Sequence, residues 1–169
     1  MRVFLLRHGI AAPPAAGKSD ESRALTLAGK KKMGSAARGM KTLDLKFDRI
    51  LCSPLTRCRQ TAEAVMKTLK TASPAIHTAA LAPDTRSSEI LKAVLQSTPT
   101  SSLLLVGHEP SLSHFASFLL TGQDRGMSLD FKKGGLCRID FSGKPRPGTG
   151  TLVFHLTPKA LRRLGRKSR

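Results

Sequence analysis

The sequence predicts an α/β fold whose sheet is mostly parallel but mixed, and three observations support this. Short apolar runs of strand-like composition alternate with helical patterns from residue 2 to about residue 120. The run at residues 103–106 is uniformly apolar, as in a strand buried on both faces. After Gly122, two strand-like runs are joined by a loop rich in Gly and Pro, which indicates a hairpin-like addition to the sheet.

The predicted strands differ in the strength of their pattern. The weakest is the short run at residues 75–78. The others, in chain order, are residues 3–6, 47–51, 103–106, 136–141 and 151–156.

The predicted helices lie between these strands. The most regular follows Ser53-Pro54 and places apolar residues at positions 55, 58, 62, 65, 66 and 69; Ser53 suits a helix cap and Pro54 a first turn. A second helix is predicted at residues 26–40, although Gly29, Gly34 and Gly39 weaken it. A third begins at Pro110, with apolar residues at 112, 115, 116 and 119 on one side.

The length of 169 residues fits one compact domain, which we expect over residues 1–158, followed by a basic tail at residues 159–169. No apolar run approaches the ~20 residues that a membrane-spanning helix needs, so we expect a cytoplasmic protein. The three cysteines form no metal-like pair and are expected to be reduced core thiols.

The charge balance is strongly basic, with 29 Lys and Arg against 11 Asp and Glu and a net charge of +18. The excess gathers at residues 30–32, at residues 132–133 and in the tail, a distribution that attracts polyanions. The chain has no Tyr or Trp, however, and no basic stretch interleaved with aromatics, so a nucleic-acid surface is not favoured. We interpret the charge as a solvated surface with a frayed basic end.

Residues suited to holding phosphate follow three of the predicted strands. They are Arg7-His8-Gly9 after the first strand, Ser53-Pro54 and then Arg57 after the second, and Gly107-His108-Glu109-Pro110 after the apolar one. Ligands bind at the carboxyl ends of strands in open α/β sheets, so these sets are expected to converge on one crevice.

Each member of this set has a chemical reason to be there. Arginine offers a rigid fork of donors that matches phosphate oxygens, and Arg57 falls in the first turn of its helix, where the helix dipole also favours an anion. Gly9 allows the backbone to turn away without a side chain crowding the pocket. A neutral histidine held in one tautomer, such as His8, can act as a nucleophile.

Two rival sites fit the spacing less well. Thiol phosphatases place five residues between Cys and Arg, whereas Arg57 and Arg59 follow Cys52 after four and six residues, so Cys52 is assigned to the core. A zinc-binding helix needs histidines four apart, but His114 lies six residues after His108. The isolated residues His77 and His155 are assigned structural roles, and no metal or other cofactor is predicted.

Taken in chain order, the motifs resemble those of the histidine phosphatase superfamily, which has a phosphoglycerate mutase-like fold, and in particular its short, SixA-type phosphohistidine phosphatase branch. The motifs are Arg7-His8-Gly9, residues 23–29, residues 53–57 with 60–63, and residues 107–110. The resemblance implies a three-layer α/β/α sandwich and a metal-free, two-step reaction in which His8 takes the phosphoryl group. It also implies that Arg7, Arg57 and His108 neutralise the phosphoryl oxygens, that Gly9 and Arg23 bind substrate, and that water then releases phosphate.

The chain departs from the phosphomonoester-cleaving members of this superfamily in one respect. Those members carry a glutamate in a Trp-Glu-Gly-like context, whereas this chain has no Trp and, over residues 79–90, offers only Asp84 and Glu89. An alkoxide leaves poorly without a proton donor, whereas a phosphorylated imidazole is already activated. The leading hypothesis is therefore a phosphohistidine phosphatase acting on a phosphotransfer protein.

Two alternatives remain open at this stage. The first is a phosphomonoesterase for a small metabolite or nucleotide, with Asp84 or Glu89 as the acid. The second is a polyanion-binding module in which the phosphate pocket is vestigial.

Overall fold

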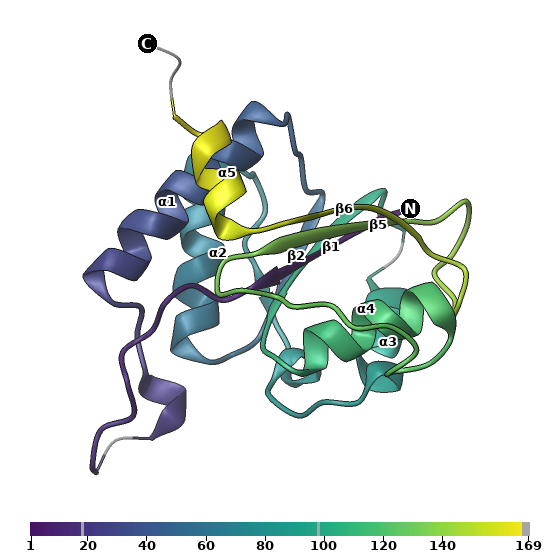
Figure 1. The fold of residues 1–169 in the computed structure, drawn as a ribbon, viewed down its shortest axis with the longest axis horizontal. Helices are drawn as coiled ribbons and strands as arrows, with labels where there is room; N and C mark the ends of the chain where they lie inside the picture. The colour runs from purple at the N-terminus through teal and green to yellow at the C-terminus, as the bar shows by residue number, and fades with distance from the viewer. Residues whose placement is uncertain (18, 98, 167–169) are drawn as a thin grey trace.

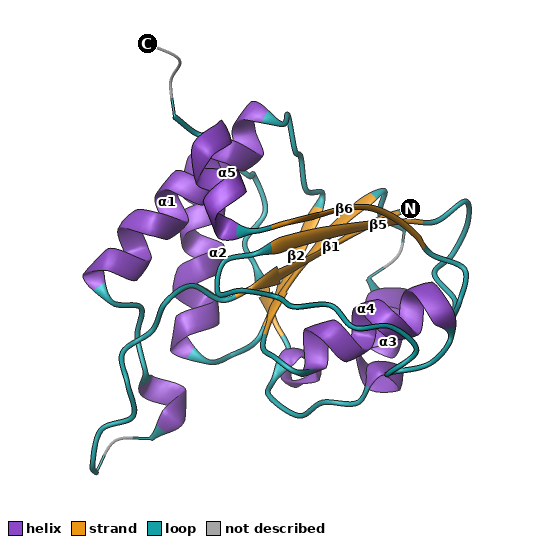
Figure 2. Cartoon of the chain, in the orientation of Figure 1, coloured by secondary structure: helices purple, strands orange, loops and turns teal. Residues whose placement is uncertain are grey.

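A six-stranded sheet lies between two layers of helices in the computed structural model, which describes residues 1–17, 19–97 and 99–166 (Figure 1, Figure 2). The strand order is β3-β2-β4-β1-β5-β6; the first four strands are parallel, and β5 and β6 are antiparallel to their neighbours. The predicted α/β class, mixed sheet and three-layer arrangement are confirmed. The strands are β1 (Arg2–Arg7), β2 (Arg49–Cys52), β3 (Ile76–His77), β4 (Ser102–Gly107), β5 (Leu136–Asp140) and β6 (Thr151–Leu156).

The central strands bury both faces, and their side chains divide between two cores. Phe4 and Leu6 of β1 belong to one apolar cluster, while Val3 and Leu5 belong to the other, as the two-residue period of a strand requires. Helices α1 (Leu27–Thr42), α2 (Thr56–Leu69) and α5 (Pro158–Leu164) cover the first face. Helices α3 (Ser87–Gln96) and α4 (Ser111–Thr121) cover the second. None of these helices is long and apolar enough to cross a membrane.

The register of the parallel strands fixes where their carboxyl ends lie. Arg7 of β1 pairs with Gly107 of β4, and Cys52 of β2 pairs with Val106 of the same strand. The segments that follow β1, β2 and β4 therefore leave the sheet side by side.

Several local predictions differ from the structure. The strand predicted at residues 47–51 begins two residues later and ends one residue later, at Arg49–Cys52, and that predicted at 75–78 shortens to Ile76–His77. Ser53 is not the cap of α2: this helix begins at Thr56, and its N-cap position, Leu55, has no side chain that could accept a hydrogen bond. Helix α3 was not predicted at all.

The expectation of a frayed basic end is wrong for the first part of the segment at residues 159–169. This stretch lies largely in α5, which packs on α1 and buries Leu161 completely. Thr157 caps the helix by accepting a hydrogen bond from the Ala160 N–H at 3.3 Å. Gly39 permits the contact, because a Cβ there would lie 2.0 Å from the Leu161 carbonyl oxygen. Residues 167–169 lie outside the described residues.

Candidate active site

The segments after β1, β2 and β4 bring four of the predicted residues into one region. The side chains of His8, Arg57 and His108 are buried, with exposed fractions of 7%, 5% and 3%. The imidazole rings of His8 and His108 lie with their centroids 5.1 Å apart. Arg7, at the end of β1, is partly exposed beside them.

His8 is held in one tautomer by its own backbone. Its Nδ1 lies 2.7 Å from the Gly9 carbonyl oxygen, which can only accept, so Nδ1 carries the proton and Nε2 has a free lone pair. Burial is the main reason that the pKa of His8 falls to about 4; the Gly9 hydrogen bond opposes this, and the charges of Arg57, Arg7 and Lys133 add to it. At neutral pH the ring is therefore an uncharged base.

His108 is also a neutral ring at neutral pH. Burial lowers its pKa to about 3, with further contributions from His8 and Arg57, while the nearby charge of Asp20 acts in the opposite direction. Its Nε2 lies 2.9 Å from the Ser53 Oγ and 3.3 Å from the Cys58 Sγ. Ser53 thus positions a ring of the site rather than capping a helix.

Arg57 is engaged by a residue that the sequence analysis did not identify. Its Nη1 donates to the backbone oxygen of Asp20 and its Nη2 donates to the Asp20 Oδ2, each at 2.8 Å. The Arg23 Nη1 donates to the Asp20 Oδ1 at 2.5 Å, and the Arg23 Nε donates to the Ala12 carbonyl oxygen at 2.8 Å. Asp20, on a 3₁₀ turn at Asp20–Ser22, thus bridges two arginines of the predicted site.

The Asp20 carboxylate is held in its ionised form. Hydrogen bonds from Arg23 and then Arg57 lower the pKa of Asp20, although about half of its side chain is exposed to solvent. The Asp20 carboxylate is an oxyanion, as phosphate is. It accepts a hydrogen bond from the Arg57 guanidinium, the group that is predicted to bind phosphate. In the sequence, the only sign of this contact is that Asp20 lies three residues before Arg23.

Arg7 and Gly9 are fixed by backbone and hydroxyl contacts. The Arg7 Nη1 donates to the Phe131 carbonyl oxygen at 2.5 Å, and its buried Nε has no partner among the described residues. The Gly9 N–H donates to the Thr61 Oγ1 at 3.0 Å, and the Thr61 hydroxyl donates to the Arg57 carbonyl oxygen at 2.7 Å. A Cβ on Gly9 would lie 2.6 Å from the Met33 Cγ, so any larger residue there would displace the Met33 side chain of α1.

The carboxyl groups proposed as acids, Asp84 and Glu89, are both exposed. Glu109 differs from them, because burial raises its pKa. The Ser113 hydroxyl donates to its Oε2 at 2.6 Å, while its buried Oε1 has no partner among the described residues. Glu109 adjoins His108 in the chain, and the charge of Arg7 acts on it.

The residues of the two rival sites lie elsewhere or have the wrong chemistry. Cys52 is completely buried, and burial raises its pKa; burial likewise raises the pKa of Cys58 to about 12. Across the described part of the chain, no three His, Cys, Asp or Glu side chains gather where they could hold a metal. His77 is exposed on β3, and His155 on β6 lies with its ring 4.6 Å from that of Phe131.

Comparison with known proteins identifies the family. Residues 3–83 match the model of the histidine phosphatase superfamily, branch 1. An uncharacterized protein of Picosynechococcus is 36% identical over 138 residues, which cover 80% of this chain and 82% of the relative. The phosphohistidine phosphatase SixA of Escherichia coli is 29% identical over 160 residues, 94% of each chain.

The chain belongs to the histidine phosphatase superfamily. A solved structure of the protein histidine phosphatase SixA complexed with tungstate superposes with a TM-score of 0.80 and 27% identity. It covers 95% of this chain and 99% of that one. The predicted SixA-type branch and the phosphoglycerate mutase-like fold of this histidine phosphatase are thereby confirmed.

Proposed function

We propose that this histidine phosphatase removes the phosphoryl group from phosphohistidine on a protein, by way of a covalent intermediate on His8. The observation that carries the proposal is the state of His8: a buried, neutral imidazole whose Nε2 is unprotonated beside Arg57 and His108. The SixA relatives and the tungstate complex support it, because tungstate is an oxyanion like phosphate.

The reaction has two displacements at phosphorus. The His8 Nε2 attacks, a new P–N bond forms, and the P–N bond of the substrate breaks with departure of its imidazole. Water then attacks phosphorus, the P–Nε2 bond breaks, and inorganic phosphate leaves. In both steps we assign Arg7, Arg57 and His108 to the phosphoryl oxygens, because donors placed around developing charge lower the barrier.

The arginine positions suggest how the substrate enters. Arg57 meets Asp20 in this structure, so an incoming phosphoryl oxygen must use the remaining donors of the guanidinium or replace the carboxylate. Arg23 acts in this scheme by holding Asp20. We assign Gly9 to substrate binding because its backbone is hydrogen-bonded within the site, to the His8 ring and to the Thr61 hydroxyl.

The choice of a P–N substrate rests on proton supply. Asp20 is the carboxylate that bridges the arginines, and its lowered pKa makes it a poor acid at neutral pH. A phosphohistidine that carries a proton on its second ring nitrogen leaves as neutral imidazole, so it needs no donor from the enzyme. The alkoxide that leaves from a phosphate ester would need a proton donor from the enzyme.

A second candidate function is hydrolysis of a small phosphomonoester, and Glu109 is the observation that favours it. Its raised pKa and unpartnered Oε1 suit a proton donor better than the exposed Asp84 or Glu89. In that case Glu109→Gln would abolish ester hydrolysis while leaving hydrolysis of an activated P–N bond unchanged.

One labelling experiment tests the proposal. The enzyme is mixed with a ³²P-phosphohistidine protein and, separately, with a ³²P-labelled phosphate ester, and the label is mapped on the trapped enzyme. We expect rapid turnover of the phosphohistidine protein and label on His8 that is lost in acid, and neither in His8→Ala. Strong preference for the ester would refute the substrate assignment. Salt-dependent polyanion binding without turnover, unchanged in His8→Ala, would favour a binding module instead.

A further inference from the structure

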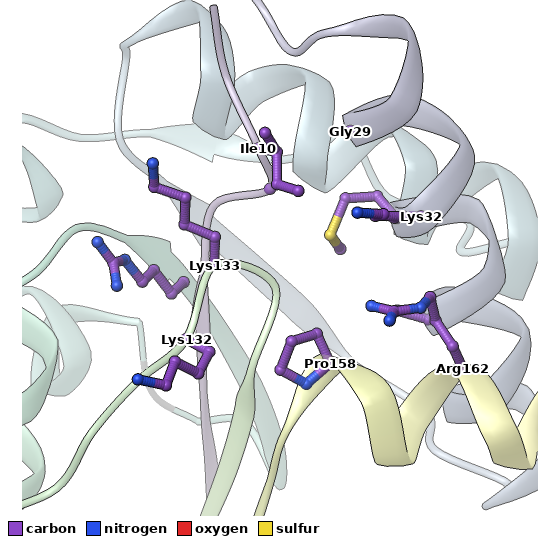
Figure 3. A pocket seen from close by; sticks show the side chains of 11 residues that line it. Ile10, Gly29, Lys32, Lys132, Lys133, Pro158 and Arg162 are labelled. Atoms are coloured by element: carbon purple, nitrogen blue, oxygen red, sulfur yellow. The ribbon is translucent and has the colours of Figure 1, made fainter. Parts of the chain in front are cut away.

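A cavity of about 410 Å³ opens beside the candidate active site (Figure 3). Arg7 and Gly9 line it, whereas His8, Arg57 and His108 do not. Its other walls come from α1, from α5 and from the loop before β5. The cavity therefore adjoins the site around His8 and shares Arg7 and Gly9 with it, and its size is that of a small binding site.

The cavity is lined by positive charge. Lys32 of α1 and Arg162 of α5 project into the space, whereas Lys132 and Lys133 lie on its opposite side with their ammonium groups directed away from it (Figure 3). Lys132 pairs with Asp130 at 2.5 Å, but no ion pair between described residues engages Lys32, Lys133 or Arg162.

The positive field of the cavity extends to the nucleophile, because the charge of Lys133 contributes to the low pKa of His8. Carboxylates are scarce in this chain, with 11 against 29 basic residues. An external anion is thus the natural counterpart of these cations.

The rest of the lining is apolar. Ile10, Met33, Ala36 and Pro158 complete the wall between the cations. A free inorganic ion would leave these surfaces uncovered, whereas an Asp or Glu side chain brings methylene groups for the apolar wall and a carboxylate for Lys32 and Arg162. The chemistry of the cavity matches a short acidic stretch of polypeptide.

We propose that this cavity binds an acidic segment of the phosphorylated protein while its phosphohistidine lies at His8. The inference rests on the proposed function and adds to it a recognition element outside the reacting centre. Arg7 of β1 and Arg162 of α5 line the cavity together with apolar side chains, and this mixed lining favours an acidic polypeptide segment over a single small phosphate. Helix α5 thereby acquires a role in recognition.

The test uses two synthetic peptides that each carry one phosphohistidine, flanked either by Asp and Glu or by Asn and Gln. The variant is the double substitution Lys32→Ala and Arg162→Ala, which spares the residues assigned to phosphoryl transfer and also Lys133. We expect a loss of about tenfold in kcat/KM for the acidic peptide, chiefly through a higher KM, since two rim charge pairs each contribute a few-fold. The neutral peptide should be turned over as before.

A matched control removes the same charge from the same helices. Lys31 and Arg163 are exposed neighbours that do not line the cavity, so Lys31→Ala with Arg163→Ala should change both peptides only slightly. Equal losses in the control and the cavity variant would overturn the inference and leave only a general field effect. Equal losses on both peptides would also overturn it.

Two further measurements keep this inference distinct from the proposed function. If the wild-type enzyme hydrolyses neither peptide, the proposed function fails, and binding of the unphosphorylated acidic peptide still tests the cavity. That binding should weaken in Lys32→Ala with Arg162→Ala and persist in Lys31→Ala with Arg163→Ala. If a small bisphosphate ester loses turnover in the cavity variant while the acidic peptide does not, the occupant is a metabolite phosphate and the inference is wrong.

Discussion

Gly39→Ala is expected to destabilise this protein, although alanine normally improves a helix. Gly39 lies in α1, where the ideal Cβ position is 2.0 Å from the carbonyl oxygen of Leu161 in α5. That neighbour is backbone, which cannot rotate aside. The two helices must therefore separate by roughly 1 Å or more to restore ordinary contact.

The magnitude follows from two opposing contributions. Alanine in place of glycine in a helix interior is worth about 1 kcal/mol in favour of folding. Displacing α5 loosens the packing of Leu161, which is fully buried, and forced overpacking of this kind costs about 1–3 kcal/mol beyond the lost contacts. The two contributions leave a net loss of roughly 0–2 kcal/mol, and the lost contacts of Leu161 raise it, so we expect the free energy of unfolding to fall by about 1–2 kcal/mol.

The same helix provides the control. Gly34 has nothing within 4 Å of its ideal Cβ position, so Gly34→Ala should stabilise the protein by about 0.5–1 kcal/mol. Because the chain has no Tyr or Trp, urea unfolding is followed by far-ultraviolet circular dichroism, with midpoints compared at constant slope. Our account of the α1–α5 contact is refuted if Gly39→Ala unfolds at the same urea concentration as the wild type or at a higher one.

Three further predictions concern the site. The folded-state pKa values of His8 and His108, about 4 and about 3, lie below the ordinary 6.5, so the unfolded chain binds more protons below pH 6.5. Stability to urea should therefore fall from pH 7 to pH 5, by roughly 2 kcal/mol or less per histidine, and less steeply in His8→Ala; a flat wild-type profile would contradict this. Asp20→Asn removes the negative charge that meets Arg57, so inorganic phosphate should inhibit about threefold to tenfold more tightly; weaker inhibition would show that the carboxylate serves only to position the arginine. Iodoacetamide should leave native Cys52 unmodified, since its thiol is buried and its pKa raised; alkylation mapped to Cys52 together with loss of activity would reopen the thiol mechanism.

The main outline of the fold and site was predictable because it depends on sequence order and strand period. Residues 103–106 were recognisable as a central strand from four consecutive apolar side chains, and all of β4 is buried. Once β1, β2 and β4 are parallel neighbours, the residues after each strand must meet at one edge of the sheet. Placing His8 beside His108 required no knowledge of the intervening loops.

The contacts that were not predicted are tertiary ones between distant or weakly patterned segments. Asp20 reaches Arg57 across 37 positions from a short turn, and no periodicity marks such a contact. The sequence predicts a solvated tail because residues 159–169 carry six basic residues and no acid, whereas Leu161 in the structure is fully buried against the core. The glycines of α1 were interpreted as weaknesses, whereas Gly39 allows a close approach of helices that propensity cannot reveal.

The cations around His8 affect both its protonation and the proposed chemistry. A low pKa makes an imidazole a weaker nucleophile, so phosphoryl transfer from an ordinary histidine onto His8 would be unfavourable if basicity alone decided it. The charges of Arg7 and Arg57 that disfavour a proton on this ring also attract the negative oxygens of a phosphoryl group bound to it. A poorly basic nitrogen then becomes a good leaving group when water attacks. In the proposed reaction, the charges of Arg7 and Arg57 would hold the phosphoryl group on Nε2 in the first step. The low basicity of the ring, which burial and those charges both cause, would keep the P–N bond labile in the second.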